Sequence, residues 1–424
     1  MLKQNPVHPV LGAAKRALGP KAFFIISSTL SRALWAFYTI YLATVLGQSV
    51  YGEFIFLQIT AAFAGQILVG SFLNISAFEM SAAPDFDAAL KIFLRSNLYV
   101  AMLGAATVPI IILCQILHLM PGSYLTAVAI AALTVATAMG GQVVAFACSQ
   151  NAYRIAASLG VTSLALYVGG CTFLRNPNAL SVIAAVFLAQ SAPFILSVLW
   201  LSSTGRIGLA GFLDRRSLGA LFRQHRDALA TNLSSLPQQF LIWIMARNLM
   251  SFGGPAEFSR YGIANQINNL FLFFPTSFAP MFITWIGKDD RLVSRIRISL
   301  GMAGAFSSLG LVAAAGVMVA LNVHPVYIPH EFLAASGPMT IALIMAGLVA
   351  ARSPFAWINQ INRDYRAEWI ISLGTAACMA ISLVPAYSDN SEALLFIRTA
   401  AALAGLCVSI ALLFLSARRN GLRV

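Results

Sequence analysis

Apolar stretches of roughly 20 to 30 residues alternate with short polar segments along the whole chain. A hydrocarbon core about 30 Å thick takes about 20 helical residues to cross, so each stretch is long enough for one transmembrane helix. We therefore predict an all-α membrane protein with about twelve transmembrane helices. The predicted spans are 20–46, 53–79, 97–119, 123–149, 155–174, 179–202, 229–252, 258–286, 297–322, 332–357, 368–387 and 391–415.

The composition agrees with a membrane protein. Hydrophobic residues make up 59% of the chain and charged residues 10%, and the mean hydropathy is +0.80. A soluble domain carries about 25% charged residues. The connections between the predicted spans are short, so they leave no room for a sizeable soluble domain.

The formal net charge of +13 reflects membrane topology. With the N-terminus placed inside, the predicted inner segments hold most of the 27 Lys and Arg residues, and the predicted outer loops hold only Arg175. Basic residues collect in the cytoplasmic loops of membrane proteins, so we expect both termini in the cytoplasm. Because the basic residues are spread over many loops, no nucleic-acid partner is expected.

The longest polar segment divides the chain into two halves. It contains five Arg residues interleaved with apolar ones, a pattern typical of a segment lying on an anionic membrane surface. We predict an N-terminal six-helix lobe over 1–202, a cytoplasmic basic connector over 203–228 and a C-terminal six-helix lobe over 229–424.

The two halves are weakly repetitive. Shifted by 207 residues, the segment LATVLGQSVYGEF (42–54) aligns Gly47 with Gly254, Tyr51 with Phe258 and Phe54 with Tyr261. Transporters are often built from such repeats, with the substrate site between them. Two six-helix lobes around a central cavity are the predicted architecture.

Four arginines fall within or at the edge of the predicted spans. A charged side chain at the centre of a bilayer costs about 2.5–3.5 kcal/mol on insertion scales, so such residues usually face a bundle interior or water. A guanidinium suits phosphate or carboxylate recognition. The candidates for a cationic cavity are Arg32, Arg247, Arg260 and Arg398. Alternatively, the outer three reach the interface or pair with a glutamate, and Glu53 and Glu79 are available near the ends of the second span.

Amide and aromatic side chains accompany these arginines at helical spacing. On the first span, Ser28, Arg32, Trp35 and Thr39 form one stripe, and on the seventh span Gln239 and Trp243 precede Arg247 by two turns and one turn, respectively. Such side chains suit sugar hydroxyls and sugar faces, although helix–helix contacts in membranes use the same amides. The candidate sugar contacts are Gln239, Trp243, Asn265, Asn268 and Asn269.

The sequence gives little sign of a disulfide, cofactor or metal site. The five cysteines lie in apolar runs without a CxxC pair, which is typical of small core residues. We find no phosphate-binding glycine loop and expect neither a cofactor nor a metal. Asp85 and Asp87 have a D-x-D spacing but sit in a short loop, which favours a solvated turn.

Two segments resemble the bacterial polysaccharide flippases. They are LGQSVYGEF (46–54) and FGGPAEFSRYGIANQINNLFLFFPTSFAPMF (252–282). This family belongs to one superfamily with the MATE drug exporters and the lipid II flippase. The resemblance implies a MATE-like fold and a positively charged cavity, at positions that Arg32, Arg247, Arg260 and Arg398 could supply.

The resemblance also implies a function. An undecaprenyl-pyrophosphate-linked repeat unit for O-antigen, capsule or exopolysaccharide would be moved across the bacterial cytoplasmic (inner) membrane by alternating access. A polysaccharide polymerase and a chain-length regulator are the expected protein partners. Glu53 is the one candidate for a coupling residue. Two alternatives stay open: a cation or drug antiporter, which predicts an acidic cavity, and a membrane-embedded polymerase or ligase, which predicts a substantial outer loop.

Overall fold

The computed structural model describes residues 19–116, 124–174, 177–203, 226–288, 292–323, 330–361 and 365–419, and these parts of the chain are helical almost throughout. Within them, eight segments are long and apolar enough to cross a membrane. The first of these, Phe23–Gln66, covers parts of the first two predicted spans. The chain is a multi-pass helical membrane protein, as the hydrophobic pattern predicted.

The first half begins with a long, broken helix. Helix α2 (Pro20–Ala82) contains one non-helical residue, Gly47, where the chain turns back, so it supplies two spans. The helices that follow in this half are α3 (Phe86–Ile116), α4 (Tyr124–Ser149), α5 (Tyr153–Thr172) and α6 (Ala179–Ser203). The predicted connector at 203–228 lies outside the described residues except at its two ends.

The second half has a similar order of helices. Its elements are α8 (Arg226–Asn248), the π-turn η2 (Leu249–Gly253), α9 (Gly254–Lys288), α10 (Leu292–Val323), α11 (His330–Ala334), α12 (Ser336–Ile361), α13 (Tyr365–Met379), the 3₁₀ turn η4 (Ala380–Leu383), α14 (Pro385–Ser388) and α15 (Ser391–Arg419). Every predicted span overlaps one of these elements. The largest differences are the start of α3, 11 residues before the predicted 97, and the replacement of the end of 368–387 by η4 and α14.

The two halves turn at equivalent glycines. Gly47 has φ 74° and ψ 160°, and Gly254 has φ 80° and ψ 174°. Glycine adopts such positive φ values without the steric cost that other residues carry. The two residues are 207 positions apart, so the shift found in the sequence also relates the backbone conformations. Ile55 packs directly on Gly262, its equivalent by the same shift, as expected for two repeats that meet around an approximate two-fold axis.

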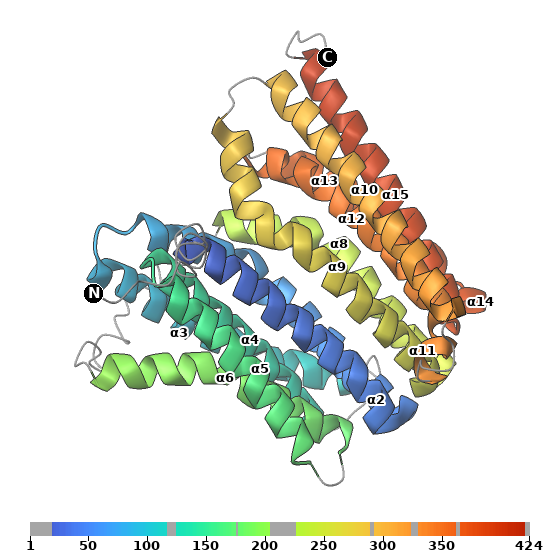
Figure 1. Cartoon of the computed structure of the whole chain (residues 1–424), viewed down its shortest axis with the longest axis horizontal. Coiled ribbons are helices and arrows are strands. Elements are labelled where there is room, and N and C mark those ends of the chain that lie inside the picture. The colour runs from blue at the N-terminus through green and yellow to red at the C-terminus, as the bar shows by residue number, and fades with distance from the viewer. Residues whose placement is uncertain are drawn as a thin grey trace, which may run out of the picture.

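The junction between the halves is a buried aromatic core close to these turns. The side chains of Tyr51, Phe54, Phe258 and Tyr261 are at most 1% exposed. Phe56 meets Phe258 edge to face, with ring centroids 5.7 Å apart. The halves contact each other mainly where α2 packs on α8 and α9. Figure 1 shows the helices of both halves converging at this end and diverging toward the end that holds the two termini.

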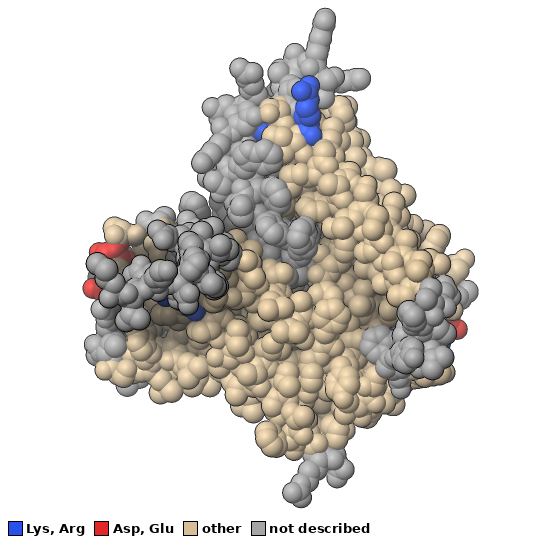
Figure 2. Space-filling model, viewed as in Figure 1, with Lys and Arg blue, Asp and Glu red and all other residues tan. Residues whose placement is uncertain are grey.

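The surface fits an apolar environment around the middle of the molecule. On the face drawn in Figure 2, charged side chains lie toward the extremities and a broad uncharged band separates them. Many large apolar side chains are exposed, among them Ile26, Leu30, Leu113 and Val312. A monomeric soluble protein rarely exposes so much contiguous apolar surface, so this band is the part that contacts lipid.

Gly52 is a sensitive point of the junction. A Cβ atom at Gly52 would overlap the carbonyl oxygen of Pro255, which is backbone and has no room to move. Overpacking of this kind costs about 1–3 kcal/mol. We predict that Gly52→Ala lowers the apparent melting temperature of the detergent-purified protein by about 3 °C or more. The control is Gly169→Ala, where an added Cβ meets nothing within 4 Å; equal melting of both variants would contradict the tight junction.

Candidate binding cavity

Two adjoining cavities lie beside the junction, toward the ends where the two halves diverge (Figure 1). The first, about 510 Å³, is lined by α2, α4, α5, α6 and α9. The second, about 400 Å³, is lined by the second part of α2 and by α4, α6 and α9. Thr137, Gln190, Gln266 and Asn269 belong to both, so the two cavities meet. Each lies within the usual range of about 300–1,000 Å³ for small-molecule sites.

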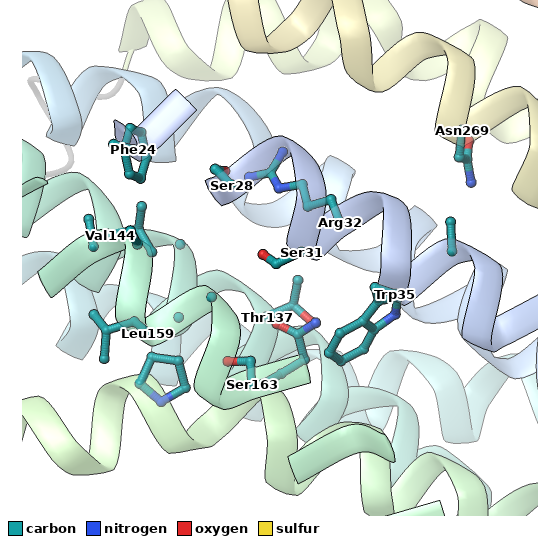
Figure 3. Close-up of a pocket in the computed structure, with 18 of the residues that line it drawn as sticks. Phe24, Ser28, Ser31, Arg32, Trp35, Thr137, Val144, Leu159, Ser163 and Asn269 are labelled. Atoms are coloured by element: carbon teal, nitrogen blue, oxygen red, sulfur yellow. The ribbon is translucent and has the colours of Figure 1, made fainter. Parts of the chain in front are cut away.

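One face of α2 supplies the polar wall of the first cavity. Arg32 follows Ser28 by four residues and Trp35 follows Arg32 by three, which places them on one side of the helix, and Ser31 lines the cavity beside Arg32. In Figure 3 the Arg32 guanidinium lies beside Ser28, toward the start of α2, and the Trp35 indole points toward Thr137 and Ser163. The predicted stripe on the first span therefore faces this cavity, apart from its last member, Thr39, which is fully buried.

Arg32 sets the electrostatic character of the cavities. Its side chain is exposed, and it is the one charged residue among the described residues that line either cavity. A cation surrounded by apolar helices attracts an anion more strongly than it would in water, because the surroundings screen less. The described lining is therefore suited to an anionic ligand.

Trp35 is held in place by stacking. Its ring lies 4.2 Å from the ring of Tyr167, with an interplanar angle of 20°. Tyr38 meets the same Tyr167 ring edge-on at 5.3 Å. Thr39 donates its hydroxyl proton to the Trp35 carbonyl, at 2.9 Å. It can then only accept at the 3.1 Å contact with the Tyr167 hydroxyl, which fixes Tyr167 as the donor. The indole is thus a rigid part of the wall.

An amide pair joins α2 and α9 where the cavities meet. Gln266 donates from Nε2 to Oε1 of Gln58 across 3.0 Å. Gln58 lines the second cavity and Gln266 lines both. One hydrogen bond uses only part of the capacity of two amides, so both can also bond a ligand. Gln58, Gln190 and Thr137 were not predicted to belong to a site, because isolated polar residues in apolar spans have no periodic signal.

The predicted sugar contacts divide into two groups. Asn265 lines the second cavity and Asn269 lines both. Asn268 is 3% exposed and donates from Nδ2 to Oδ1 of Asn269 at 3.4 Å. Gln239 and Trp243 line neither of the two cavities. Trp243 is buried, stacks on Phe63 with ring centroids 5.5 Å apart, and donates to the Thr60 hydroxyl at 3.3 Å.

The other three predicted arginines lie near the Gly254 end of α8, α9 and α15, away from Arg32, and line neither cavity. Arg247 donates to Oδ1 of its neighbour Asn248 at 3.2 Å. Arg260 forms a 2.9 Å ion pair with Glu257. Arg398 hydrogen-bonds the Tyr261 hydroxyl and lies over the Tyr261 ring, 5.8 Å from its centroid.

Two acidic residues, Glu257 and Glu53, lie near the Gly254 and Gly47 turns. Glu257 accepts hydrogen bonds from the backbone N–H and the hydroxyl of Ser391, at 3.0 and 2.5 Å. It thereby fastens the start of α15 to α9. Glu53, the candidate coupling residue, is exposed and follows the Gly47 turn, and it lines neither cavity.

An ion pair in the second half was not anticipated. Arg352 lies on α12, near the end of the predicted span 332–357. Its guanidinium lies 3.2 Å from a carboxylate oxygen of Glu368 on α13, and the side chains are 20% and 16% exposed. Asn359 donates to the other oxygen of Glu368 at 2.8 Å. The carboxylate is thus bonded on both oxygens and connects α12 with α13.

We predict that Arg352 and Glu368 stabilise the fold as a unit. Removing one partner leaves a poorly solvated charge, so Arg352→Gln and Glu368→Gln should each lower the free energy of unfolding by on the order of 2 kcal/mol. The double variant should lose less than the sum of the single losses. Unfolding in mixed micelles measures all three, with Arg366→Gln, an exposed position on α13, as the control. Strictly additive losses would show that the pair is not coupled.

Solved structures of other membrane transporters share this architecture, whereas matches to the sequence itself are lacking. No family model and no curated protein matches the sequence. Among solved structures, the chain is similar to an outward-facing multidrug-resistance MATE transporter of the MOP superfamily, with a TM-score of 0.61, 14% identity and coverage of 95% of this chain and 96% of that one. The chain has a MATE-like fold. An inward-facing MATE structure also matches, with a TM-score of 0.55, 14% identity and coverage of 93% and 96%.

A third similar structure is a MOP-superfamily transporter from Pyrococcus furiosus, described as having a binding pocket of reverse polarity that suggests a different function. It matches with a TM-score of 0.54 and 13% identity, over 95% of this chain and 96% of that one. The MATE-like fold thus includes proteins in which pocket polarity differs. The polarity of the cavities in this chain is therefore the feature on which a functional conclusion depends.

Proposed function

We propose that this protein is an alternating-access transporter that moves an anionic headgroup across the membrane, and that the headgroup is a lipid-linked oligosaccharide diphosphate. The observation that supports the anionic substrate is Arg32, the one charged side chain in the described lining of the two cavities. The amides of Gln58, Gln190 and Asn269 suit the hydroxyl groups of sugars. The MATE-like fold favours a transporter over a membrane-embedded polymerase or ligase.

A cation or drug antiporter is the second candidate. It would need a carboxylate to attract its cationic substrate or coupling ion, and the described lining of the two cavities contains neither Asp nor Glu. Among the acidic residues described elsewhere, Glu257 and Glu368 are each paired with an arginine. The charge of the cavity therefore favours an anion.

The proposed cycle uses the separation of the two halves. With both termini in the cytoplasm, the diverging ends of the helices face the inside (Figure 1), and the junction around Gly47 and Gly254 closes the outer side. A headgroup enters from the inner leaflet, its phosphate binds Arg32, and the polyprenyl tail stays in lipid. The membrane potential helps, because moving one negative charge outward gains about 2.3 kcal/mol per 100 mV.

The proposed orientation can be tested by labelling single cysteines. In a variant without the five native cysteines, we predict that Asp389→Cys reacts with a membrane-impermeant maleimide on intact cells. Lys91→Cys should react only after the membrane is opened. Both positions are exposed, and they lie at opposite ends of their helix bundles. The reverse pattern would invert the topology.

The function is tested in a strain that lacks the gene and depends on it for surface polysaccharide. We predict that Arg32→Ala reduces the surface polymer at least about tenfold and leaves the complete lipid-linked repeat unit on the inner leaflet. Arg32→Lys should retain part of the activity, because it keeps the charge but not the planar fork. Surface polymer and extracted lipid-linked oligosaccharides are measured in parallel.

The matched control is Arg154→Ala, an exposed arginine at the start of α5 that lines neither cavity. It should behave as wild type at equal expression. Normal surface polymer in the deletion strain, together with altered sensitivity to cationic drugs, would contradict the flippase and support the antiporter.

A further inference from the structure

A stacked aromatic pair lies directly beside the proposed phosphate site. Trp35 follows Arg32 by three residues on α2, so their Cβ atoms are neighbours on one helix face, about 5–6 Å apart. Both side chains line the same cavity. A phosphate held by Arg32 would therefore have its next covalently attached group within reach of the indole.

The two side chains occupy different depths. The Arg32 guanidinium lies toward the start of α2, beside Ser28, and the Trp35 indole lies one turn further along the helix, toward Thr137 and Ser163 (Figure 3). Since α2 starts at the end where the halves diverge (Figure 1), the charged group of a ligand would bind nearer the opening. The group attached to it would lie deeper, in the part of the cavity that contains the shared amides.

The indole is already ordered before any ligand arrives. Tyr167 covers one face at 4.2 Å, and Tyr167 is itself fully buried and held by Tyr38 and Thr39. Trp35 is only half-buried, so part of its ring remains open to the cavity. A rigid aromatic surface loses little conformational entropy on binding, which favours contact with a flat or ring-shaped group.

Hydrogen-bonding groups surround this aromatic surface. Thr137 and Ser163 lie near the indole in Figure 3, and Gln190 and Gln266 line the same cavity. Their hydroxyl and amide groups both donate and accept. A sugar ring has apolar C–H faces and a rim of hydroxyls, and this arrangement fits both properties at once.

We propose that Trp35 is the sugar-stacking residue of the cavity. The ring attached directly to the phosphate lies against the indole while Arg32 holds the phosphate, so the cavity selects glycosyl phosphates over phosphates without a ring. This inference rests on the proposed function and deepens it, because it assigns the recognition of the first sugar to a named residue in the first half of the chain.

The test uses soluble probes and the full chain in lipid nanodiscs. The probes are methyl phosphate, α-D-glucose 1-phosphate and uncharged methyl α-D-glucoside, and dissociation constants come from titrations followed by NMR. The wild type should bind glucose 1-phosphate about tenfold more tightly than methyl phosphate, from the stacking contribution. The glucoside should bind more weakly than glucose 1-phosphate, and saturation transfer should reach the sugar protons.

Three variants separate phosphate binding from stacking of the sugar ring. Trp35→Leu should bind methyl phosphate as the wild type does but lose the tenfold preference for glucose 1-phosphate. Trp35→Phe should keep most of the preference. Trp200→Leu is the control, because Trp200 is 52% exposed on α6 and lines neither cavity. Thermal melting shows that each variant is folded.

Each outcome has a distinct meaning. Equal binding of the two phosphates by the wild type would overturn the stacking role and leave the anionic cavity intact. Loss of methyl phosphate binding in folded Trp35→Leu would also overturn it, since the tryptophan would then only support the wall. If the wild type binds neither phosphate, and its titrations therefore do not differ from those of Arg32→Ala, the proposed function itself would be overturned.

Discussion

The close packing of α2 on α9 beside their turns is the constraint on which the rest of the structure depends. Two positive-φ glycines allow the chain to turn back at equivalent points, and two further glycines allow the backbones to approach: Gly52 under Pro255 and Gly262 under Ile55. Small residues are the usual means of close helix contact in lipid, where no hydrophobic force drives helices together. The junction closes one end of the molecule and lets the halves separate at the other.

The cavities follow from this geometry. Beyond the aromatic core, polar side chains replace apolar ones on the facing sides of α2 and α9, beginning with Gln58 and Gln266. These amides bond across the boundary between the halves, so a change in the angle between the halves would alter this hydrogen bond. A ligand that bonds to them would therefore act on one of the contacts between the two halves.

The charged side chains in the apolar part of the molecule have different surroundings. Arg352 with Glu368 and Arg260 with Glu257 pair with a carboxylate on the same half, which avoids the cost of a lone charge in low dielectric. Arg32 instead faces a cavity large enough to hold water or an anion. The two ion pairs lie in the second half and line neither cavity, whereas Arg32 lines the first cavity, where a ligand could contact it. Of the four arginines that the sequence grouped together, Arg32 lines a cavity, Arg260 pairs with Glu257, and Arg247 and Arg398 bond Asn248 and Tyr261.

Much of the fold was readable from the sequence, because lipid requires every backbone polar group to be bonded within its own helix. Apolar length then predicts the spans, and the 207-residue shift already related Gly47 to Gly254. One helix face is also a local property, so the stripe containing Arg32 and Trp35 could be predicted. What only the tertiary structure decided is which faces meet. Arg398 bonds Tyr261 and Trp243 stacks on Phe63, while Gln58, Thr137 and Gln190 join the cavity. These contacts link residues far apart in the chain, and they depend on how whole helices pack, which no local pattern of residues records.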